Sequence, residues 1–568
     1  MMTSGLDTQI ARTALCLGLL GLPLGTLLSL ALEASDERAP SRQRPASAWL
    51  VHMGSWGLVY LLWLALVQRG MLAMVITLTL QWVVHRSHQA KWQSLKEPFL
   101  LQDFEYFLDA VRHPRLYLPF FGITLAISAT LAGLLAIAAF WWLEPSLVSM
   151  LGPQQSVLWW LFLALAPSAA LALGLTRLPG ASLDPVAHHR RLGLWAGFWA
   201  FARYPDTPID VSRAPISLRQ PRRMHFNQPS IPLSQHTPPF RPSVDNLPHL
   251  VIVQGESLFD PRPWYSRVPA EVLSHWDHLC ASALAHGRLS VPAWGANTVR
   301  SETAFLCGLS ADALGMHRFN PYHQLARQQV PSLASACSQL GYRTLVLHPY
   351  PASFYQRDKV MPRLGFDVFE DLDNFRHERR DGPYVADAVL AERVERALQD
   401  PDPRPLMVLV ITMESHGPFL LEPMPSPLRW LTPDARRPDK VSHELDIYLH
   451  HLANIDAMIG HLAEALTGQS RPGLLCAYGD HVPILSASYD WLGDPDGKTP
   501  FLLWSPQGAS IDPQPPVTEL TELADGVLDA ASALAYQDAE RRSSASPHFS
   551  HGISPNVSGR VRRQKESP

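Results

Sequence analysis

Cysteine is scarce in this chain, which narrows the kinds of site that it can hold. Only five of the 568 residues are cysteines, and none of them forms a C-x-x-C pair. This excludes the clustered thiolate sites that bind structural zinc, and it leaves room for at most two disulfides. Cys307 and Cys476 lie beside expected core segments, where simple buried thiols fit equally well.

Charge is also sparse. Charged residues make up 17% of the chain and the formal net charge is −4, so nothing favours a nucleic-acid partner. No internal repeat is present. What the chain has in quantity is apolar sequence, unevenly distributed: the first 175 residues carry the long apolar stretches, whereas the remainder has the composition of a soluble enzyme.

The apolar stretches predict a transmembrane anchor of five helices. One of them, at 119–142, is long enough to cross about 30 Å of hydrocarbon at about 1.5 Å per residue, whereas the one at 70–85 is short enough to be re-entrant instead. The first does not look like a cleaved signal peptide, because residues 33–36 (Glu-Ala-Ser-Asp) are a poor cleavage site. The predicted spans lie near 14–32, 48–67, 70–85, 119–142 and 156–176.

Two arguments about the orientation of this anchor disagree. Five spans with the amino terminus inside would place the rest of the chain outside. The positive-inside rule favours the inverse orientation, because an amino terminus on the inside would leave only Arg12 and Arg69 on that side. The cations that would lie outside are Arg38, Arg42, Arg44, Arg86, Lys91, Lys96, Arg112 and Arg115.

The segment after the anchor divides into three further parts. Residues 188–203 mix arginines with four aromatic rings, which suits a helix in the headgroup layer or a packed soluble helix. The proline-rich stretch that follows predicts an extended linker, and the Ser-, Arg- and Pro-rich carboxyl terminus predicts a disordered tail. The predicted division is therefore 1–176 anchor, 177–248 interfacial helix and linker, 249–535 catalytic domain, and 536–568 tail.

Four short apolar runs in the second half end at residues that can bind a metal ion or a phosphoryl group. Runs of this length, bounded by turn signals, predict strands buried on both faces of a parallel sheet. Ligands collect beyond the carboxyl ends of such strands, so we expect these residues to converge on a metal-dependent active site. The runs are 250–253 before Glu256, 344–347 before His348, 407–412 before His416, and 474–478 before Asp480 and His481.

The segment 294–308 offers a nucleophile. A glycine at 295 lets the backbone approach an anion, and the residues after Thr298 read as the first turn of a helix, whose amino end favours negative charge. A divalent metal can lower the pKa of a hydroxyl and activate it. Thr298 is the candidate, with Ser301 and Thr303 as rivals, although a threonine before a helix is ordinarily only a cap.

These segments resemble the lipoteichoic acid synthase group of phosphoglycerol transferases, in the alkaline phosphatase and sulfatase superfamily. The similarity includes the group's metal motif, its nucleophile segment, and the loop between its third and fourth spans, in order along the chain. It implies an α/β sandwich catalytic domain after a five-helix anchor. The matching segments are 254–259 (Gln-Gly-Glu-Ser-Leu-Phe), 295–302, 348–358 with 364–367, 412–419, 478–481 and 91–103.

The resemblance implies a role for each site residue. Glu256, Thr298, Asp480 and His481 would bind one divalent ion; mostly oxygen ligands favour Mn²⁺ or Mg²⁺, with Zn²⁺ still open. His416 would contact phosphoryl oxygens or act as the acid for the leaving group. The headgroup would be held by His348, Arg357 and Tyr355, the last standing where the family often has tryptophan. Glu302 reads as no more than an acid in the first helical turn.

The resemblance also implies a reaction and a location. Thr298 would attack the phosphate of phosphatidylglycerol, expel diacylglycerol and pass the glycerophosphate to a hydroxyl of an envelope glycan or glycerol acceptor. The protein would be a multi-pass protein of the bacterial inner membrane with its catalytic domain on the periplasmic or extracellular side.

Other functions fit the same residues. A phosphoethanolamine transferase would need only a different headgroup pocket. A sulfatase is disfavoured, because residues 237–241 (Thr-Pro-Pro-Phe-Arg) have the spacing of a C/S-x-P-x-R motif but the wrong first residue. A membrane scaffold without activity is disfavoured because every expected catalytic position is filled.

Overall fold

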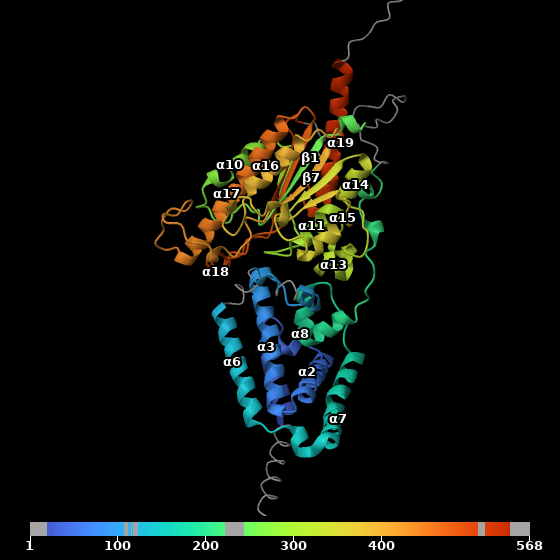
Figure 1. The fold of residues 1–568 in the computed structure, drawn as a ribbon, viewed down its shortest axis with the longest axis vertical. Helices are drawn as coiled ribbons and strands as arrows, with labels where there is room; N and C mark the ends of the chain where they lie inside the picture. The colour runs from blue at the N-terminus through green and yellow to red at the C-terminus, as the bar shows by residue number, and fades with distance from the viewer. Residues whose placement is uncertain are drawn as a thin grey trace, which may run out of the picture.

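The chain folds into a helical region and an α/β domain stacked end to end (Figure 1). This computed structural model describes residues 20–106, 112–114, 116, 123–221, 243–508 and 517–545. The helical region lies at one end of the long axis, and the α/β domain occupies the other (Figure 1).

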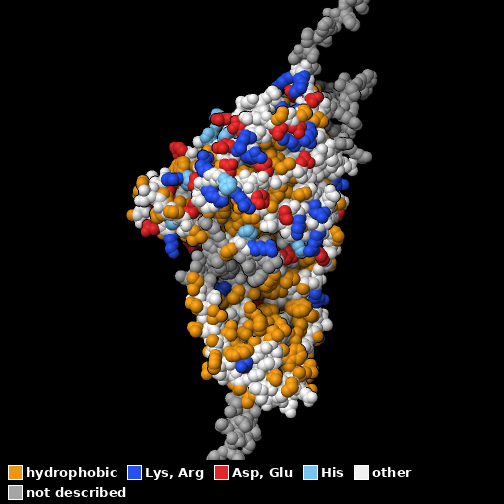
Figure 2. Space-filling model, in the orientation of Figure 1, with side chains coloured by type: hydrophobic (Ala, Val, Ile, Leu, Met, Phe, Trp, Pro, Cys, Tyr) orange, Lys and Arg blue, Asp and Glu red, His pale blue; other side chains and the backbone are white. Residues whose placement is uncertain are grey.

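The helical region is built from long apolar helices. Apolar side chains dominate the surface that Figure 2 shows for it, while charged side chains gather on the α/β domain; Leu135 on α6 and Phe162 on α7, for example, are 71% and 61% exposed. Apolar surface of this extent needs a nonaqueous partner. The helices are Leu20–Ala34, α2 (Ala46–Val67), α3 (Gly70–Leu95), α6 (Ile123–Leu143), α7 (Leu147–Thr176) and α8 (Pro185–Ala202).

Two of these helices meet the requirements of a membrane span. Among the described residues, α2 and α7 are long and apolar enough to cross a bilayer, judged by length and composition. The five-span anchor therefore stays a prediction. Residues 14–19 and 119–122 of the predicted first and fourth spans lie outside the described residues. The predicted span 70–85 is part of a longer helix, because α3 continues to Leu95.

The α/β domain is a seven-stranded sheet in the order β2-β9-β8-β1-β7-β3-β4. The four strands that the sequence predicts, β8, β1, β7 and β3, are confirmed; they are neighbours and run parallel, with Val251 paired to both Val408 and Leu475. Their carboxyl ends therefore lie along one edge of the sheet. The strand bounds are β1 His249–Gly255, β2 Ala285–Leu289, β3 Arg343–Leu347, β4 Val368–Glu370, β7 Leu406–Ile411, β8 Gly473–Gly479 and β9 Thr499–Trp504.

Helices cover both faces of this sheet, which confirms the α/β sandwich (Figure 1). Each face has its own apolar core, because side chains alternate along the strands: Ile252 and Leu409 belong to one core, Val251 and Val408 to the other. The first core is closed by α11 (Thr298–Cys307), α14 (Leu333–Leu340), α15 (Arg357–Arg363) and α19 (Leu520–Ala545), the second by α10 (Ser274–Cys280), α16 (Asp387–Leu398) and α17 (Asp439–Thr467).

The structure differs from the sequence prediction between the anchor and the sheet. The stretch expected to be an extended linker contributes Ile209, Ala214 and Leu218 to the first core, and part of it forms the short helix α9 (Ile216–Arg219). Three apolar side chains that can be buried outweigh the stiffness of the intervening prolines. Residues 222–242 of the predicted linker lie outside the described residues.

Two further helices, α8 and α19, bear on the sequence predictions: two alternatives were open for the first, and disorder was predicted for the end of the second. Helix α8 buries His188, Leu192 and Phe201 among other side chains, so it packs as an internal helix and does not only rest on a surface. Helix α19 continues through 536–545, which the sequence assigned to a disordered tail. The four described cysteines are free thiols, Cys280, Cys307, Cys337 and Cys476.

The loop after α3 joins the helical region to the α/β domain. Glu97 accepts a hydrogen bond of 2.8 Å from Arg300 Nη1 on α11, and Lys96 forms a 2.8 Å ion pair with Asp494. Gly295 has φ +69°, and a Cβ there would lie 2.7 Å from the carbonyl oxygen of Ser94. The helix that begins at Thr298 is therefore held directly against this loop.

A second polar network supports the loop that follows β7. His451 Nδ1 donates to Glu414 at 2.9 Å and its Nε2 donates to Glu422 at 3.2 Å. Burial opposes the charge, but the two carboxylates outweigh it and raise the pKa of His451 to about 10. The loop that carries His416 is thereby anchored to α17 by a buried imidazolium.

We predict that replacing Glu97 by Gln destabilises the protein. Arg300 is only 6% exposed at its side chain and would keep a buried, unpaired charge. We expect a loss of about 2–3 kcal/mol, below the roughly 3–5 kcal/mol of a fully buried pair because the Glu97 side chain is 22% exposed. Thermal unfolding in detergent measures this loss of stability. The control, Asp496→Asn, breaks the exposed Arg288 pair and should cost less than about 1 kcal/mol; equal losses would contradict a special role for Glu97.

We also predict that stability falls in alkaline solution. The folded-state pKa of His451 is raised, so its contribution is complete below about pH 6.5 and is lost as pH rises through about 10. The shift in the pKa of His451 corresponds to a stabilisation on the order of 5 kcal/mol at about 1.36 kcal/mol per pKa unit. His451→Gln should flatten the decline in melting temperature between pH 7 and 10, whereas His461→Gln on the same helix should not. A His451→Gln profile as steep as that of the native protein would refute this.

Candidate active site

Three predicted metal ligands come together at the carboxyl edge of the sheet. Glu256 follows β1, and Asp480 and His481 follow β8; all three are buried, and their ligand atoms lie within 4.8 Å of one another. His481 Nε2 is 3.3 Å from Asp480 Oδ2 and 3.7 Å from Glu256 Oε1. Adjacent parallel strands bring these distant segments together, as the sequence predicts.

Hydrogen bonds hold both carboxylate-bearing residues: the Glu256 carboxylate accepts from the Ser257 hydroxyl at 2.8 Å, and backbone groups hold Asp480. Asp480 Oδ1 accepts hydrogen bonds from the N–H groups of Ser257 (2.9 Å) and His481 (2.8 Å), which leaves Oδ2 buried and without a hydrogen-bond partner. The N–H of Glu256 donates to Thr412 Oγ1 at 2.8 Å. Ser257 adopts φ +56°, so the chain turns sharply just after β1. One oxygen of Asp480 is thus held by the backbone and the other is available to a ligand.

Three site histidines are anchored in the same way. The Nδ1 atoms of His481, His348 and His416 lie 3.1, 3.1 and 2.7 Å from backbone carbonyl oxygens of Val482, Ile411 and Gly417. Because a carbonyl only accepts, Nδ1 carries the proton and Nε2 keeps its lone pair in each neutral ring. The Nε2 atoms of His481 and His348 are buried without a hydrogen-bond partner, so both rings present an acceptor to a ligand.

The electrostatics of the site call for a cation. Burial raises the pKa of Asp480 to about 7, and burial together with the Asp480 charge raises the pKa of Glu256. Burial lowers the pKa of His481, which favours the neutral, ligating ring. A divalent ion would compensate both carboxylates and take up the free Asp480 Oδ2 and His481 Nε2. The donor set of two carboxylates, one imidazole and a nearby hydroxyl therefore fits a metal.

The candidate nucleophile lies beside this cluster. Helix α11 begins at Thr298, after Asn297 in the left-handed region at φ 67°, and the Thr298 hydroxyl interacts with the Asp480 carboxylate. The rival hydroxyls are used elsewhere: Ser301 donates to the Asp480 carbonyl at 2.6 Å, and Thr303 donates to the Val299 carbonyl at 2.7 Å. Of the three hydroxyls, that of Thr298 is the one that interacts with the Asp480 carboxylate.

Arg357 is buried beneath this region and paired. Its guanidinium donates to Glu302, which also accepts from the Tyr322 hydroxyl and, at 3.5 Å, from Gln254. The expectation that Glu302 is only an acid in the first helical turn is wrong, because its side chain is fully buried and bound to Arg357. Arg357 Nη1 has no hydrogen-bond partner, so one donor remains for an anion.

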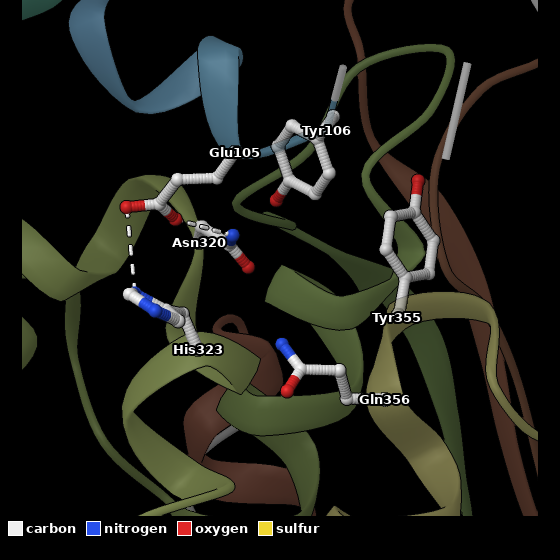
Figure 3. Close-up of a pocket in the computed structure, with 6 residues that line it drawn as sticks. All are labelled: Glu105, Tyr106, Asn320, His323, Tyr355 and Gln356. Atoms are coloured by element: carbon white, nitrogen blue, oxygen red, sulfur yellow. Dashed lines mark hydrogen bonds and ion pairs between the residues drawn. The ribbon is translucent and has the colours of Figure 1, made fainter. Parts of the chain in front are cut away.

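Tyr355 lies next to Arg357 and faces a cavity. The Arg357 guanidinium carbon is 5.4 Å from the centre of the Tyr355 ring. The cavity has a volume of about 210 Å³ and is lined by residues from three segments (Figure 3). Four of the other lining residues lie outside every recognised motif, because they are ordinary polar side chains in the loop after α3 and in segments near α13 (Pro321–Leu325). They are Glu105, Tyr106, Asn320 and His323; Gln356, the remaining one, lies in the segment 348–358.

Several known proteins are similar to this chain. A capsular polysaccharide biosynthesis protein, RkpI of Rhizobium meliloti, is 27% identical over 427 residues, 72% of each chain. A putative cyclic beta-1,2-glucan modification protein of the same organism is 24% identical over 274 residues, 45% of this chain and 42% of that protein.

Among solved structures, the lipooligosaccharide phosphoethanolamine transferase A of Neisseria meningitidis superposes with a TM-score of 0.50 at 14% identity. The match covers 86% of this chain and 90% of that one, and it shows that the fold is shared across both regions. The phosphoglycerol transferase GacH of Streptococcus pyogenes matches 56% of this chain and 83% of its own, with a TM-score of 0.44 and 20% identity.

A protein-family model matches the α/β domain. The model of the sulfatase family matches residues 248–533, just over half of the 568 residues. The matched range contains the whole seven-stranded sheet and every ligand-bearing strand end described above. The chain belongs to the sulfatase family, within the alkaline phosphatase and sulfatase superfamily.

Proposed function

We propose that this protein is a membrane-anchored, metal-dependent transferase that moves phosphoglycerol from phosphatidylglycerol to a cell-envelope glycan or glycerol acceptor. The observation that carries the proposal is the meeting of Thr298, at the start of a helix, with a buried cluster of Glu256, Asp480 and His481 that has ligand atoms to spare. Such a site suits attack on a phosphate diester by a hydroxyl.

The metal would be held by Glu256, Thr298, Asp480 and His481. When bound, it would lower the pKa of the threonine hydroxyl and neutralise charge on the phosphoryl oxygens. Two carboxylates and a hydroxyl favour Mn²⁺, with Mg²⁺ and Zn²⁺ as alternatives.

The first step would transfer the glycerophosphate to the enzyme. Thr298 Oγ1 forms a bond to phosphorus as the bond from phosphorus to the diacylglycerol oxygen breaks, and the proton of the hydroxyl leaves with the product. Because its Nδ1 is bound to a carbonyl, His416 would take up the Thr298 proton at Nε2 and pass it to the departing oxygen. Arg357 Nη1 and the amino end of α11 would stabilise the negative oxygens.

The second step would transfer the glycerophosphate from Thr298 to the acceptor. A hydroxyl of the acceptor attacks the phosphothreonine, the bond to Thr298 Oγ1 breaks, and the threonine regains a proton. Burial, followed by the Arg357 charge, lowers the pKa of His348 well below its ordinary value. The neutral ring would then accept a hydrogen bond from a headgroup hydroxyl through Nε2, which suits glycerol.

The donor and acceptor classes follow from the surroundings of the site. The apolar surface of the helical region (Figure 2) would keep the chain in the bilayer, where a lipid donor resides. The names of two relatives, which concern capsular polysaccharide and cyclic beta-1,2-glucan, support a glycan acceptor. We propose a bacterial inner-membrane location with the catalytic domain on the periplasmic or extracellular side.

A phosphoethanolamine transferase is the second candidate. The fold likeness to the Neisseria enzyme extends over 86% of this chain, and the same metal site and threonine would serve. The two functions differ in the donor headgroup, so one assay with two lipids separates them.

We predict that diacylglycerol release from labelled phosphatidylglycerol requires both metal and Thr298. Thr298→Ala should lower the rate by at least about 10³-fold, because the attacking group is removed, and chelator should abolish release until Mn²⁺, Mg²⁺ or Zn²⁺ is restored. Mass spectrometry should find phosphoglycerol on Thr298 of the native protein. Thr303→Ala, on the same helix, is the matched control and should stay within about threefold. If diacylglycerol is released from phosphatidylethanolamine and not from phosphatidylglycerol, the transferred group is phosphoethanolamine.

A second prediction concerns topology. A cysteine introduced at exposed Arg379 of the catalytic domain should react with a membrane-impermeant maleimide in spheroplasts. A cysteine at Ser146, between α6 and α7, should react only after permeabilisation. The native chain supplies the background labelling. The reverse pattern would place the catalytic domain in the cytoplasm and sink the proposed location.

A further inference from the structure

The cavity beside Tyr355 lies at the junction of the two regions of the protein. Glu105 and Tyr106 come from the loop after α3, Asn320 and His323 from the segment at α13, and Tyr355 and Gln356 from the loop after β3 (Figure 3). At about 30 Å³ per water, its volume of about 210 Å³ holds about seven waters. That is room for one small polar group.

The lining is held in place by contacts between the two regions. Glu105 accepts a hydrogen bond of 2.6 Å from the Asn320 amide and lies 3.4 Å from His323 Nδ1. The Tyr106 hydroxyl donates to the Phe319 carbonyl at 3.3 Å, and its ring meets the Tyr355 ring edge to face at 5.5 Å. The cavity therefore depends on the loop from the helical region and would not exist in the α/β domain alone.

The chemistry of the lining selects among ligands. The Glu105 carboxylate repels a phosphate group, and an acyl chain would leave the carboxylate, two amides and an imidazole without water or partners. Glu105 already receives two polar contacts, so it is not a lone counter-ion waiting for a cation. Amides that both donate and accept, a carboxylate that accepts, and the faces of two tyrosines match a neutral group with several hydroxyls.

The cavity also lies near the reacting centre. Tyr355 joins it to Arg357, and Arg357 pairs with Glu302 on α11. Glu302 is one helical turn from Thr298, about 6 Å at about 1.5 Å per residue. A hydroxyl-rich group in the cavity would thus be connected to the nucleophile helix through Tyr355, Arg357 and Glu302.

We propose that Glu105, Asn320 and His323, with Tyr106, Tyr355 and Gln356, form a polyol-binding subsite that holds a neutral polyhydroxyl group during transfer. This rests on the proposed function for its role, although not for the binding itself. Two sources share this chemistry: a sugar of the acceptor glycan and the glycerol of the donor lipid. The kinetic arms of the test separate them.

The binding arm uses the full chain in detergent, with methyl α-D-glucoside and glycerol as probes in saturation-transfer NMR. We expect native protein to bind at least one probe, and Glu105→Gln and Asn320→Ala to weaken that binding about tenfold through lost hydrogen bonds to a charged or buried partner. Glu271→Gln, an exposed glutamate outside the cavity, is the matched control. Absence of binding by the native protein to either probe would overturn the subsite.

The kinetic arm measures KM for each substrate in the same variants. A tenfold rise in KM for the glucoside acceptor assigns the subsite to the acceptor; a rise in KM for phosphatidylglycerol assigns it to the donor glycerol. Unchanged values of both in Glu105→Gln, an isosteric change at an exposed side chain, would overturn the proposal. A native protein that binds the probes but never cleaves a phospholipid would instead refute the proposed function while keeping the binding site.

Discussion

Two buried carboxylates that need a positive partner determine much of this active site. Glu256 and Asp480 end adjacent strands, and water cannot compensate them there. The backbone satisfies one oxygen of Asp480, the other lies 3.3 Å from the unprotonated Nε2 of His481 so that both could bind one cation, and the first turn of α11 supplies Thr298. A third buried carboxylate, Glu302 on that helix, has its own cation in Arg357. The arrangement thus separates a structural ion pair from a cluster suited to a metal.

The helical region does more than attach the catalytic domain to a bilayer. The last turn of α3 lies against the nucleophile segment at Gly295, and the loop after α3 pairs with Arg300 on α11 and lines the cavity beside Tyr355. Because Arg300 lies two residues after Thr298, a shift of this loop would displace the start of α11. The placement of the helical region and the geometry of the site are therefore mechanically linked, as the proposed transfer from a membrane lipid would require.

Sequence was sufficient where the signal is local. Each ligand-bearing strand is a short apolar run followed by its functional residue, so β1, β3, β7 and β8 and the cluster of Glu256, Asp480 and His481 could be predicted. Contacts between distant segments could not: nothing near Glu302 indicates Arg357, 55 residues away, and nothing near Glu105 indicates Asn320. The linker misprediction has the same origin, since proline content was visible but the core that receives Leu218 was not.

Three of the cations that conflict with the positive-inside rule form close ion pairs. Arg44 forms a buried pair with Glu33 at 3.0 Å, Lys91 with Asp103 at 2.8 Å, and Lys96 with Asp494 of the α/β domain. The last pair, together with Glu97 and Arg300, requires these cations to lie on the same side as the catalytic domain, whichever side that is. Some of these cations are therefore explained by ion pairs at the junction of the two regions and not by membrane insertion alone. The charge count is for this reason a weaker argument for a cytoplasmic catalytic domain.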